Sequence, residues 1–123
     1  MGFIVVEETG FLRLRMTGVL TGADLVELSA ATREIELRSE RVPHRMTDLR
    51  AVSRMDIGFP EVQALADERR SYRFPNAFRS AIVVGNPVQL GMASMFRTLN
   101  DNPQICIEIF EEEALAIRWL QEV

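Results

Sequence analysis

The feature that most restricts the possible folds of this chain is a run of four apolar residues, Ala81-Ile82-Val83-Val84. A strand with no polar residue on either side fits a sheet covered on both faces, which is typical of parallel strands. Gly85 ends the run, Asn86 can cap a helix and Pro87 suits its first turn, so a helix follows directly. A buried strand that leads straight into a helix predicts an α/β fold.

The rest of the chain repeats this alternation after an initial hairpin. The hairpin turns at Gly10, and Thr21 with Asp24 three residues later marks the start of the first helix. The pattern predicts strands over residues 2–7, 11–17, 44–49, 81–84 and 104–110, and helices over 22–40, 60–71, 87–99 and 111–120. The order β-β-α-β-α-β-α-β-α predicts a single domain over residues 1–123, with helices on a mixed, mostly parallel five-stranded sheet.

Apolar spacing also predicts which side chains form the core. The inner face of the second helix should carry Val62, Leu65, Ala66 and Arg69, and that of the third helix Leu90, Met95 and Leu99. Cys106 lies between two isoleucines of an expected strand, so we expect a buried, unreactive thiol.

Composition and the missing motifs exclude several classes of function. A net charge of −4 argues against nucleic-acid binding, which normally requires a basic surface. The chain has one histidine, His44, expected as a surface or capping residue, and one cysteine, so we predict no metal site, no cofactor and no catalytic residues. The N-terminus lacks the pattern of a signal peptide, and no apolar run approaches the ~18 residues of a membrane span. We therefore expect a cytoplasmic protein.

One segment, residues 47–59, concentrates polar side chains where an expected strand ends and a helix begins. Backbone N–H groups at a helix start favour anions, so this segment is the candidate site for a partner or ligand. Its candidate residues are Asp48, Arg50, Ser53, Arg54, Asp56 and Phe59. A purely structural interpretation is also open, in which Asp56 caps the next helix and Asp48 pairs with an arginine.

The same segment resembles the signature of the STAS domain (sulfate transporter and anti-sigma factor antagonist). In that family a strand ends in Asp-Leu, a hydrophobic position follows, and Asp-Ser-Ser-Gly-Leu opens the second helix. Asp48-Leu49, Val52, Asp56 and Gly58-Phe59 match in type. The element order is similar over almost the whole chain, and residues 79–120 resemble the bacterial STAS-like branch, which is related to CRAL-TRIO lipid-binding folds.

The chain departs from that signature at the residue on which the family's regulation depends. The resemblance implies a serine between the aspartate and the glycine, phosphorylated by a partner kinase, but this chain has Ile57 there and is one residue shorter. Isoleucine cannot accept a phosphate, so we expect no standard phosphorylation switch. Ser53 is the nearest hydroxyl in the segment.

Three functions stay open at this point. The first is a regulatory domain that binds a protein partner through the segment 50–59, with Phe59 as an exposed anchor. The second is a small-molecule or lipid binder whose apolar pocket is lined by methionines and phenylalanines: Met46, Met55, Met92, Met95, Phe59, Phe74, Phe78 and Phe96.

The third is an enzyme that uses Asp48 and Asp56 as an acid/base pair, which requires that one of them is buried with a raised pKa. Ordinary core packing would explain the methionines and phenylalanines equally well. A homodimer, formed through an edge strand of the hairpin or the Met92/Phe96 face, is also possible.

Overall fold

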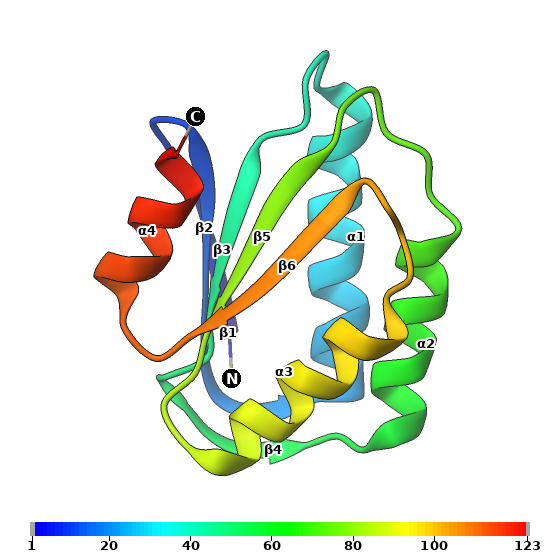
Figure 1. The fold of residues 1–123 in the computed structure, drawn as a ribbon. Coiled ribbons are helices and arrows are strands. Elements are labelled where there is room, and N and C mark those ends of the chain that lie inside the picture. The colour runs from blue at the N-terminus through cyan, green and yellow to red at the C-terminus, as the bar shows by residue number, and fades with distance from the viewer. Residues whose placement is uncertain (1, 123) are drawn as a thin grey trace.

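A computed structural model describes residues 2–122 and shows a twisted sheet with helices on both faces (Figure 1). The first half of the chain forms β1 (Gly2–Glu8), β2 (Phe11–Thr21), α1 (Gly22–Arg38), β3 (His44–Asp48), β4 (Val52–Asp56) and α2 (Phe59–Arg70). The second half forms β5 (Phe78–Val83), α3 (Pro87–Leu99), β6 (Ile105–Phe110) and α4 (Glu113–Gln121). The predicted α/β class and its alternation of strands and helices are confirmed.

The sheet is mixed and mostly parallel, as predicted. Its main path runs β1-β2-β3-β5-β6, with β1 antiparallel to β2 and the other neighbours parallel. Helices α1, α2 and α3 lie on one face of the sheet, and α4 lies alone on the other (Figure 1). The carboxyl ends of β3, β5 and β6 therefore meet at one edge, and their loops are joined by backbone hydrogen bonds from Leu49 to Val83 and from Val84 to Phe110.

The sheet has six strands rather than the predicted five, because part of the expected loop 50–59 is the strand β4. β4 runs parallel to the second half of β2, from the pair Gly18 and Val52 to the pair Thr21 and Asp56. The register of β2 shifts between Gly18 and Val19, so this long strand pairs with β3 along its first half and with β4 along its second. The correct order is β-β-α-β-β-α-β-α-β-α.

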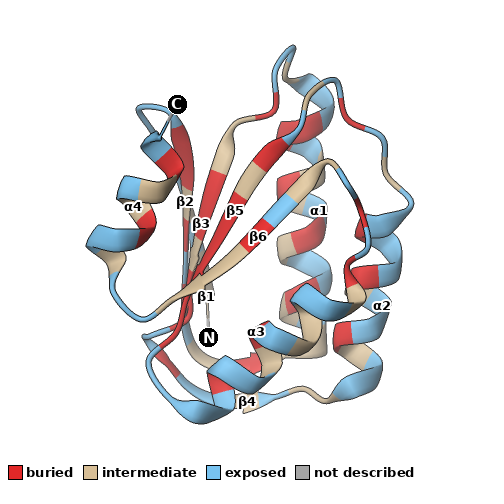
Figure 2. Ribbon diagram, viewed as in Figure 1, coloured by how far each residue is buried: buried red, intermediate tan, exposed pale blue. Residues whose placement is uncertain are grey.

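Hydrophobic cores form on both faces of the sheet, and β5 is buried along most of its length (Figure 2). Ile82 and Val84 belong to the core beneath α1–α3, whereas Ala81 and Val83 belong to the core beneath α4. This explains why the run has no polar residue on either side. The prediction for Cys106 was wrong, because its thiol is exposed. It lies on the edge strand β6, between residues that face the opposite core.

The helix starts confirm most of the capping signals. Thr21 and Asp24 form a capping box on α1, and the Asn86 side chain accepts a hydrogen bond from the Gln89 N–H at the start of α3. Asp56 does not cap α2, because that helix begins after Gly58, whose lack of a side chain leaves no side-chain cap.

The predicted inner face of α2 is confirmed, since Val62, Ala66 and Arg69 are buried and Leu65 packs against the core beneath α1–α3. That of α3 was wrong in part: Gln89 and Ala93 point inward, and Leu90 is exposed. Among the described helices, none combines the length and the apolar character that a membrane span requires.

Candidate functional site

The structure divides the candidate residues between two places. Asp48, at the end of β3, is only 3% exposed, and its carboxylate is bound by Arg50. Arg50 Nε donates to Oδ1 at 3.0 Å and Nη2 donates to Oδ2 at 2.9 Å, while the Arg50 backbone N–H also donates to Oδ1 at 3.0 Å. Arg15 on β2 adds a longer ion pair of 3.7 Å. Asp48 is therefore paired with an arginine, as the structural interpretation of the sequence expected.

The pKa of Asp48 argues against a role as a general acid. Burial raises the pKa of this carboxyl, but the hydrogen bonds and charge of Arg50 outweigh that effect and leave the pKa below its ordinary value. An acid/base pair with Asp56 would require a raised pKa in a buried carboxyl, and Asp56 is itself exposed. The geometry therefore does not provide the acid/base pair on which the enzymatic interpretation relied.

Arg50 connects three loops at the carboxyl edge of the sheet. Its guanidinium also lies 3.4 Å from the Glu113 carboxylate at the start of α4, and Glu113 binds Arg13 of β2 as well. On the other side, a Cβ on Gly85 would lie 3.3 Å from Arg50 Cγ, so glycine permits this close approach. Asp48, Arg50 and Glu113 therefore hold α4 and the loop after β5 against the sheet.

The remaining candidates, Ser53, Arg54, Asp56 and Phe59, lie together on β4 and the first turn of α2. All four are exposed, and the Phe59 side chain has 49% of its surface in solvent. Within residues 2–122, β4 pairs with β2 alone, so its other edge carries backbone groups free of sheet pairing. Phe59 is thus an exposed aromatic side chain that follows the charged residues Arg54 and Asp56 of the edge strand β4.

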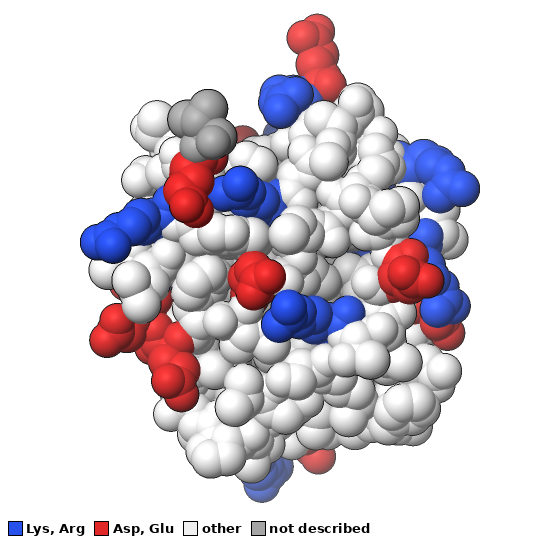
Figure 3. All heavy atoms as spheres, in the orientation of Figure 1, with Lys and Arg blue, Asp and Glu red and all other residues white. Residues whose placement is uncertain are grey.

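The start of α3 is bound to the start of β4. The buried Gln89 amide donates to the Val52 carbonyl at 3.3 Å and its oxygen accepts from the Gly85 N–H at 2.8 Å, which joins α3 to β4. Val88 and Leu90 are exposed on that helix, and Val88 has 59% of its surface in solvent. The sequence of α3 has a single charged residue, and the lower part of the face in Figure 3, over the start of this helix, is mostly uncharged.

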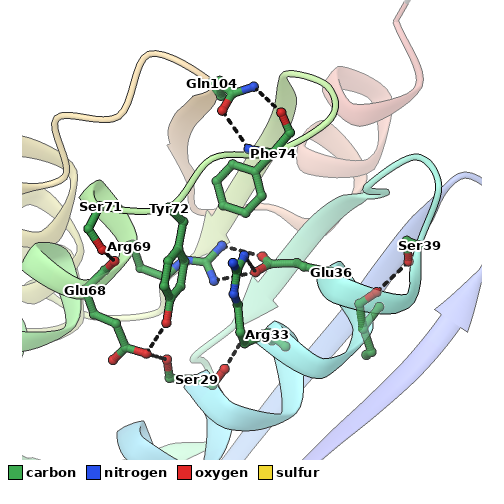
Figure 4. A network of polar contacts seen from close by, with 12 residues as sticks. Ser29, Arg33, Glu36, Ser39, Glu68, Arg69, Ser71, Tyr72, Phe74 and Gln104 are labelled. Atoms are coloured by element: carbon green, nitrogen blue, oxygen red, sulfur yellow. Dashed lines mark hydrogen bonds and ion pairs between the residues drawn. The ribbon is translucent and has the colours of Figure 1, made fainter.

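A cluster of charged side chains lies buried between α1, α2 and β3. The Glu36 carboxylate of α1 accepts hydrogen bonds from both terminal nitrogens of Arg69 of α2 (Figure 4). It also accepts one from Arg45 of β3. All three residues are buried, and Arg33 lies 3.6 Å from the same carboxylate. Burial raises the pKa of Glu36, but the two arginines outweigh that effect and lower it overall. This cluster joins α1, α2 and the sheet.

Next to this cluster, a cavity of about 130 Å³ lies between the sheet and α1–α3. Of the methionines and phenylalanines proposed for a pocket, four line it: Met55, Met92, Phe78 and Phe96. Met46 and Phe74 are buried in other clusters, and Phe59 is exposed. Arg45, Arg69 and Asn100 are among the residues around it, and the surface that lines it is mainly apolar.

Comparisons with known proteins identify the fold. No family model matches the sequence, and no curated protein matches it. One similar solved structure is an uncharacterised protein of the DUF3478 family with a SpoIIAA-like fold from Shewanella loihica PV-4, with 14% identity, a TM-score of 0.63, and coverage of 97% of this chain and 92% of that one. Another is an anti-sigma factor antagonist from Mycobacterium paratuberculosis, with 14% identity, a TM-score of 0.64, and coverage of 98% and 94%. The chain has a STAS-like fold.

The segment that resembles the STAS signature now has a defined place in this STAS-like fold. It begins at the carboxyl end of β3, passes through β4 and ends at the start of α2. Ile57, which stands where the signature implies a serine, is half-buried and packs against the core beneath α1–α3. A hydrophobic contact therefore replaces the hydroxyl at the junction of β4 and α2.

Sequence reasoning placed Arg69 on the inner face of α2 but missed its buried partners Glu36 and Arg45, although a signal for Glu36 was present. Glu36 follows Leu25, Ser29 and Thr32 on one face of α1, and Arg69 follows the apolar positions of α2. Two opposite charges on the inner faces of consecutive helices indicate an internal ion pair. His44 is half-buried, and its Nδ1 accepts a hydrogen bond of 2.8 Å from the Arg79 N–H, so it joins β3 to β5 rather than capping a helix.

Proposed function

We propose that this chain is a non-catalytic, cytoplasmic regulatory domain that binds a protein partner through β4 and the first turn of α2. The observation that carries the proposal is Phe59, which is 49% exposed between the exposed residues of β4 and α2. Large aromatic side chains surrounded by polar groups are the usual anchors of protein interfaces. Ser53, Arg54 and Asp56 supply the polar surroundings.

Two further features support this surface over others. Beyond Val52, whose carbonyl is bound by Gln89, the edge of β4 that does not pair with β2 offers backbone groups to an extended peptide segment, which is a common mode of recognition. The start of α3, which Gln89 joins to the start of β4, carries two further exposed apolar side chains, Val88 and Leu90. Asp48 and Arg50 act on this surface indirectly, because they fix the turn from which β4 begins.

The kind of partner follows from the fold and from the one departure in sequence. An anti-sigma factor antagonist has the same fold, and its name implies an anti-sigma factor as its partner. We propose a partner of this regulatory class. Because Ile57 cannot be phosphorylated, binding would be controlled by partner concentration or by a second signal rather than by a phosphate at that position.

Site-specific photocrosslinking in the native host tests the proposal. A benzophenone amino acid replaces Phe59 in one variant and Leu37, which is 70% exposed on α1, in the control. We expect a discrete crosslinked protein from position 59 and none from position 37. Equal crosslinking from both positions, or from position 37 alone, would contradict the proposed surface. Mass spectrometry of peptides over residues 50–62 should find them unmodified.

A further inference from the structure

The strand β1 forms one edge of the sheet, and its outer side is unpaired within residues 2–122. It pairs with β2 over its whole length, from Gly2 opposite Thr17 to Glu8 opposite Phe11, without a shift in register. Its sequence, GFIVVEE, contains no proline and no basic residue, and its two charges stand together at its end. Proline, lysine and bulges commonly keep edge strands from pairing with other chains, and β1 has none of them. Its outer side is therefore open to a further strand.

Two apolar side chains of β1 are exposed on the face of the sheet that carries α4. Ile4 and Val6 have 58% and 42% of their surfaces in solvent. They point away from Phe3 and Val5, which pack against the cores on the α1 side of the sheet. Helix α4 packs mainly on β5, β3 and β6, so it leaves Ile4 and Val6 uncovered. Exposed apolar side chains on an unpaired strand edge mark a surface that another chain can cover.

The apolar centre of β1 is complementary to itself in an antiparallel pair. Antiparallel strands from two copies of one chain can share a two-fold axis, which places one residue opposite its own copy. With the axis at Val5, all seven residues of β1 are paired, and Ile4 lies directly opposite the partner's Val6. Directly opposite residues lie on the same face of a sheet, so the two exposed apolar side chains of each copy cover those of the other.

The charges of β1 favour the same arrangement. The antiparallel pair places Glu7 opposite the partner's Phe3. It likewise places Glu8 opposite the partner's Gly2, so no like charges face each other. Parallel pairing in register would instead set the acidic residues of both copies side by side, which is destabilising. Arg15 of β2, whose side chain is 47% exposed, lies on the same face as the partner's Glu8 and adds a charge of opposite sign.

We propose that two copies of this chain form a homodimer through antiparallel pairing of their β1 strands about Val5. The two sheets then form one continuous sheet, with α4 of both copies on the same face. The proposal goes beyond the interaction surface at β4 and α2, because β1 pairs with residues 11–17 of β2 and β4 pairs with residues 18–21. The dimer therefore carries two copies of that surface, and a partner with two binding sites gains affinity by engaging both.

The size of this interface limits its strength. Two edge strands of seven residues bury less surface than the roughly 1,600 Å² of a standard protein interface, and small interfaces are usually weak. We expect a dissociation constant of about 1 to 100 µM. The dimer should therefore form and separate as the concentration of the chain changes.

Sedimentation velocity of the full chain tests the proposal, at concentrations from about 1 µM to about 500 µM. We expect the natural chain to shift from monomer to dimer over this range. Ile4→Lys should raise the dissociation constant at least about tenfold, because a lysine on the strand edge opposes pairing. Val26→Lys, at a side chain of α1 that is 69% exposed, should leave it unchanged. Both substitutions are at exposed positions, so both variants should match the natural chain in urea denaturation.

Disulfide crosslinking tests the register. Chains with Ile4→Cys and chains with Val6→Cys are prepared with Cys106→Ser, because the natural thiol is exposed. In the proposed register residue 4 of one copy lies opposite residue 6 of the other, with Cα atoms about 4.5 to 5.5 Å apart, which a disulfide can bridge. Two copies of residue 4 lie diagonally, about 7 to 8 Å apart, which is too far. Oxidation of the mixture should therefore give at least about tenfold more crosslinked dimer than either variant alone.

Three results would overturn the proposal. A monomer at every concentration would show that β1 does not pair with its own copy. Equal dissociation constants for Ile4→Lys and the natural chain would place the contact between copies elsewhere on the molecule. Equal crosslinking by Ile4→Cys alone and by the mixture would show that the strands do not pair about Val5.

Discussion

Replacing Glu36 by glutamine removes the one carboxylate that faces two buried guanidinium groups. The substitution preserves the volume of the side chain but removes its charge, so the hydrogen bonds from Arg45 and Arg69 lose their ionic component. The two arginines then repel each other in a buried environment. Removing one partner of a buried ion pair costs about 3 to 5 kcal/mol. We expect Glu36→Gln to lower the free energy of unfolding by this amount.

The size of the effect can be measured because the variant should still fold. A chain of 123 residues has a free energy of unfolding of about 6 to 18 kcal/mol at typical values per residue. Urea denaturation of the natural chain, of Glu36→Gln and of Asp67→Asn gives the comparison. Asp67 forms an exposed ion pair with Arg70 on the surface of α2, and its substitution should change the free energy by less than about 1 kcal/mol.

Two outcomes would refute the reasoning about Glu36. If Glu36→Gln costs no more than Asp67→Asn, the buried cluster does not hold α1, α2 and the sheet together. If Glu36→Gln is more stable than the natural chain, the cost of burying the charges exceeds their attraction, as it does for some buried ion pairs. A change in the slope of the urea transition would indicate an altered native or denatured state rather than a lost ion pair.

Three further predictions concern other elements. Thr21→Ala should lower the free energy of unfolding by about 1 kcal/mol, measured with urea, because it removes the side chain that caps α1; no loss would contradict the capping box. Asp48→Asn should cost about 1 to 3 kcal/mol at pH 7. The folded pKa of Asp48 lies below its ordinary value, so this stabilisation is present above about pH 4 and is lost as the pH falls through the folded pKa. The urea midpoints of the natural chain and of Asp48→Asn should therefore converge at acidic pH and stay apart at alkaline pH. Cys106 should react with one equivalent of a thiol reagent in the folded chain; a reaction that requires unfolding would show a buried thiol.

Much of the fold could be predicted from short stretches of sequence whose local preference agrees with their packing in the structure. The apolar run at residues 81–84 has cores on both faces, and Thr21 and Asn86 cap the helices that they were expected to start. In each case one short stretch of sequence carries the information. The resemblance at residues 48–59 extended this to the STAS-like fold, which the similar solved structures confirm.

The predictions differ from the structure where the conformation or burial of a residue depends on neighbours that are distant in sequence. Three of the residues 52–56, namely Ser53, Arg54 and Asp56, are polar and suggest a loop. The segment forms a strand because β2 is long enough to pair with it beyond the end of β3. Cys106 has the apolar neighbours of a buried residue, but it lies on the edge strand, where α4 alone covers its face of the sheet. Arg45 meets Glu36 and Arg69 through packing of α1 and α2 on β3, which no local pattern encodes.

The candidate site was therefore predicted as one segment and is found as two parts with different surroundings. Asp48 and Arg50 are joined to each other and to α4, while Ser53, Arg54, Asp56 and Phe59 are exposed on β4 and α2. Adjacent residues separate in this way because the turn after β3 places the two halves on different parts of the sheet edge. The proposed interaction surface depends on the exposed half.

Hydrogen–deuterium exchange tests the proposed interaction most directly. The chain is measured alone and in complex with the protein that copurifies with it from the native host. We expect slower exchange over residues 52–62, which contain β4 and the start of α2, and unchanged exchange over β1 and α4. Slower exchange confined to β1 or α4, with residues 52–62 unaffected, would contradict the central claim that partners bind at β4 and α2.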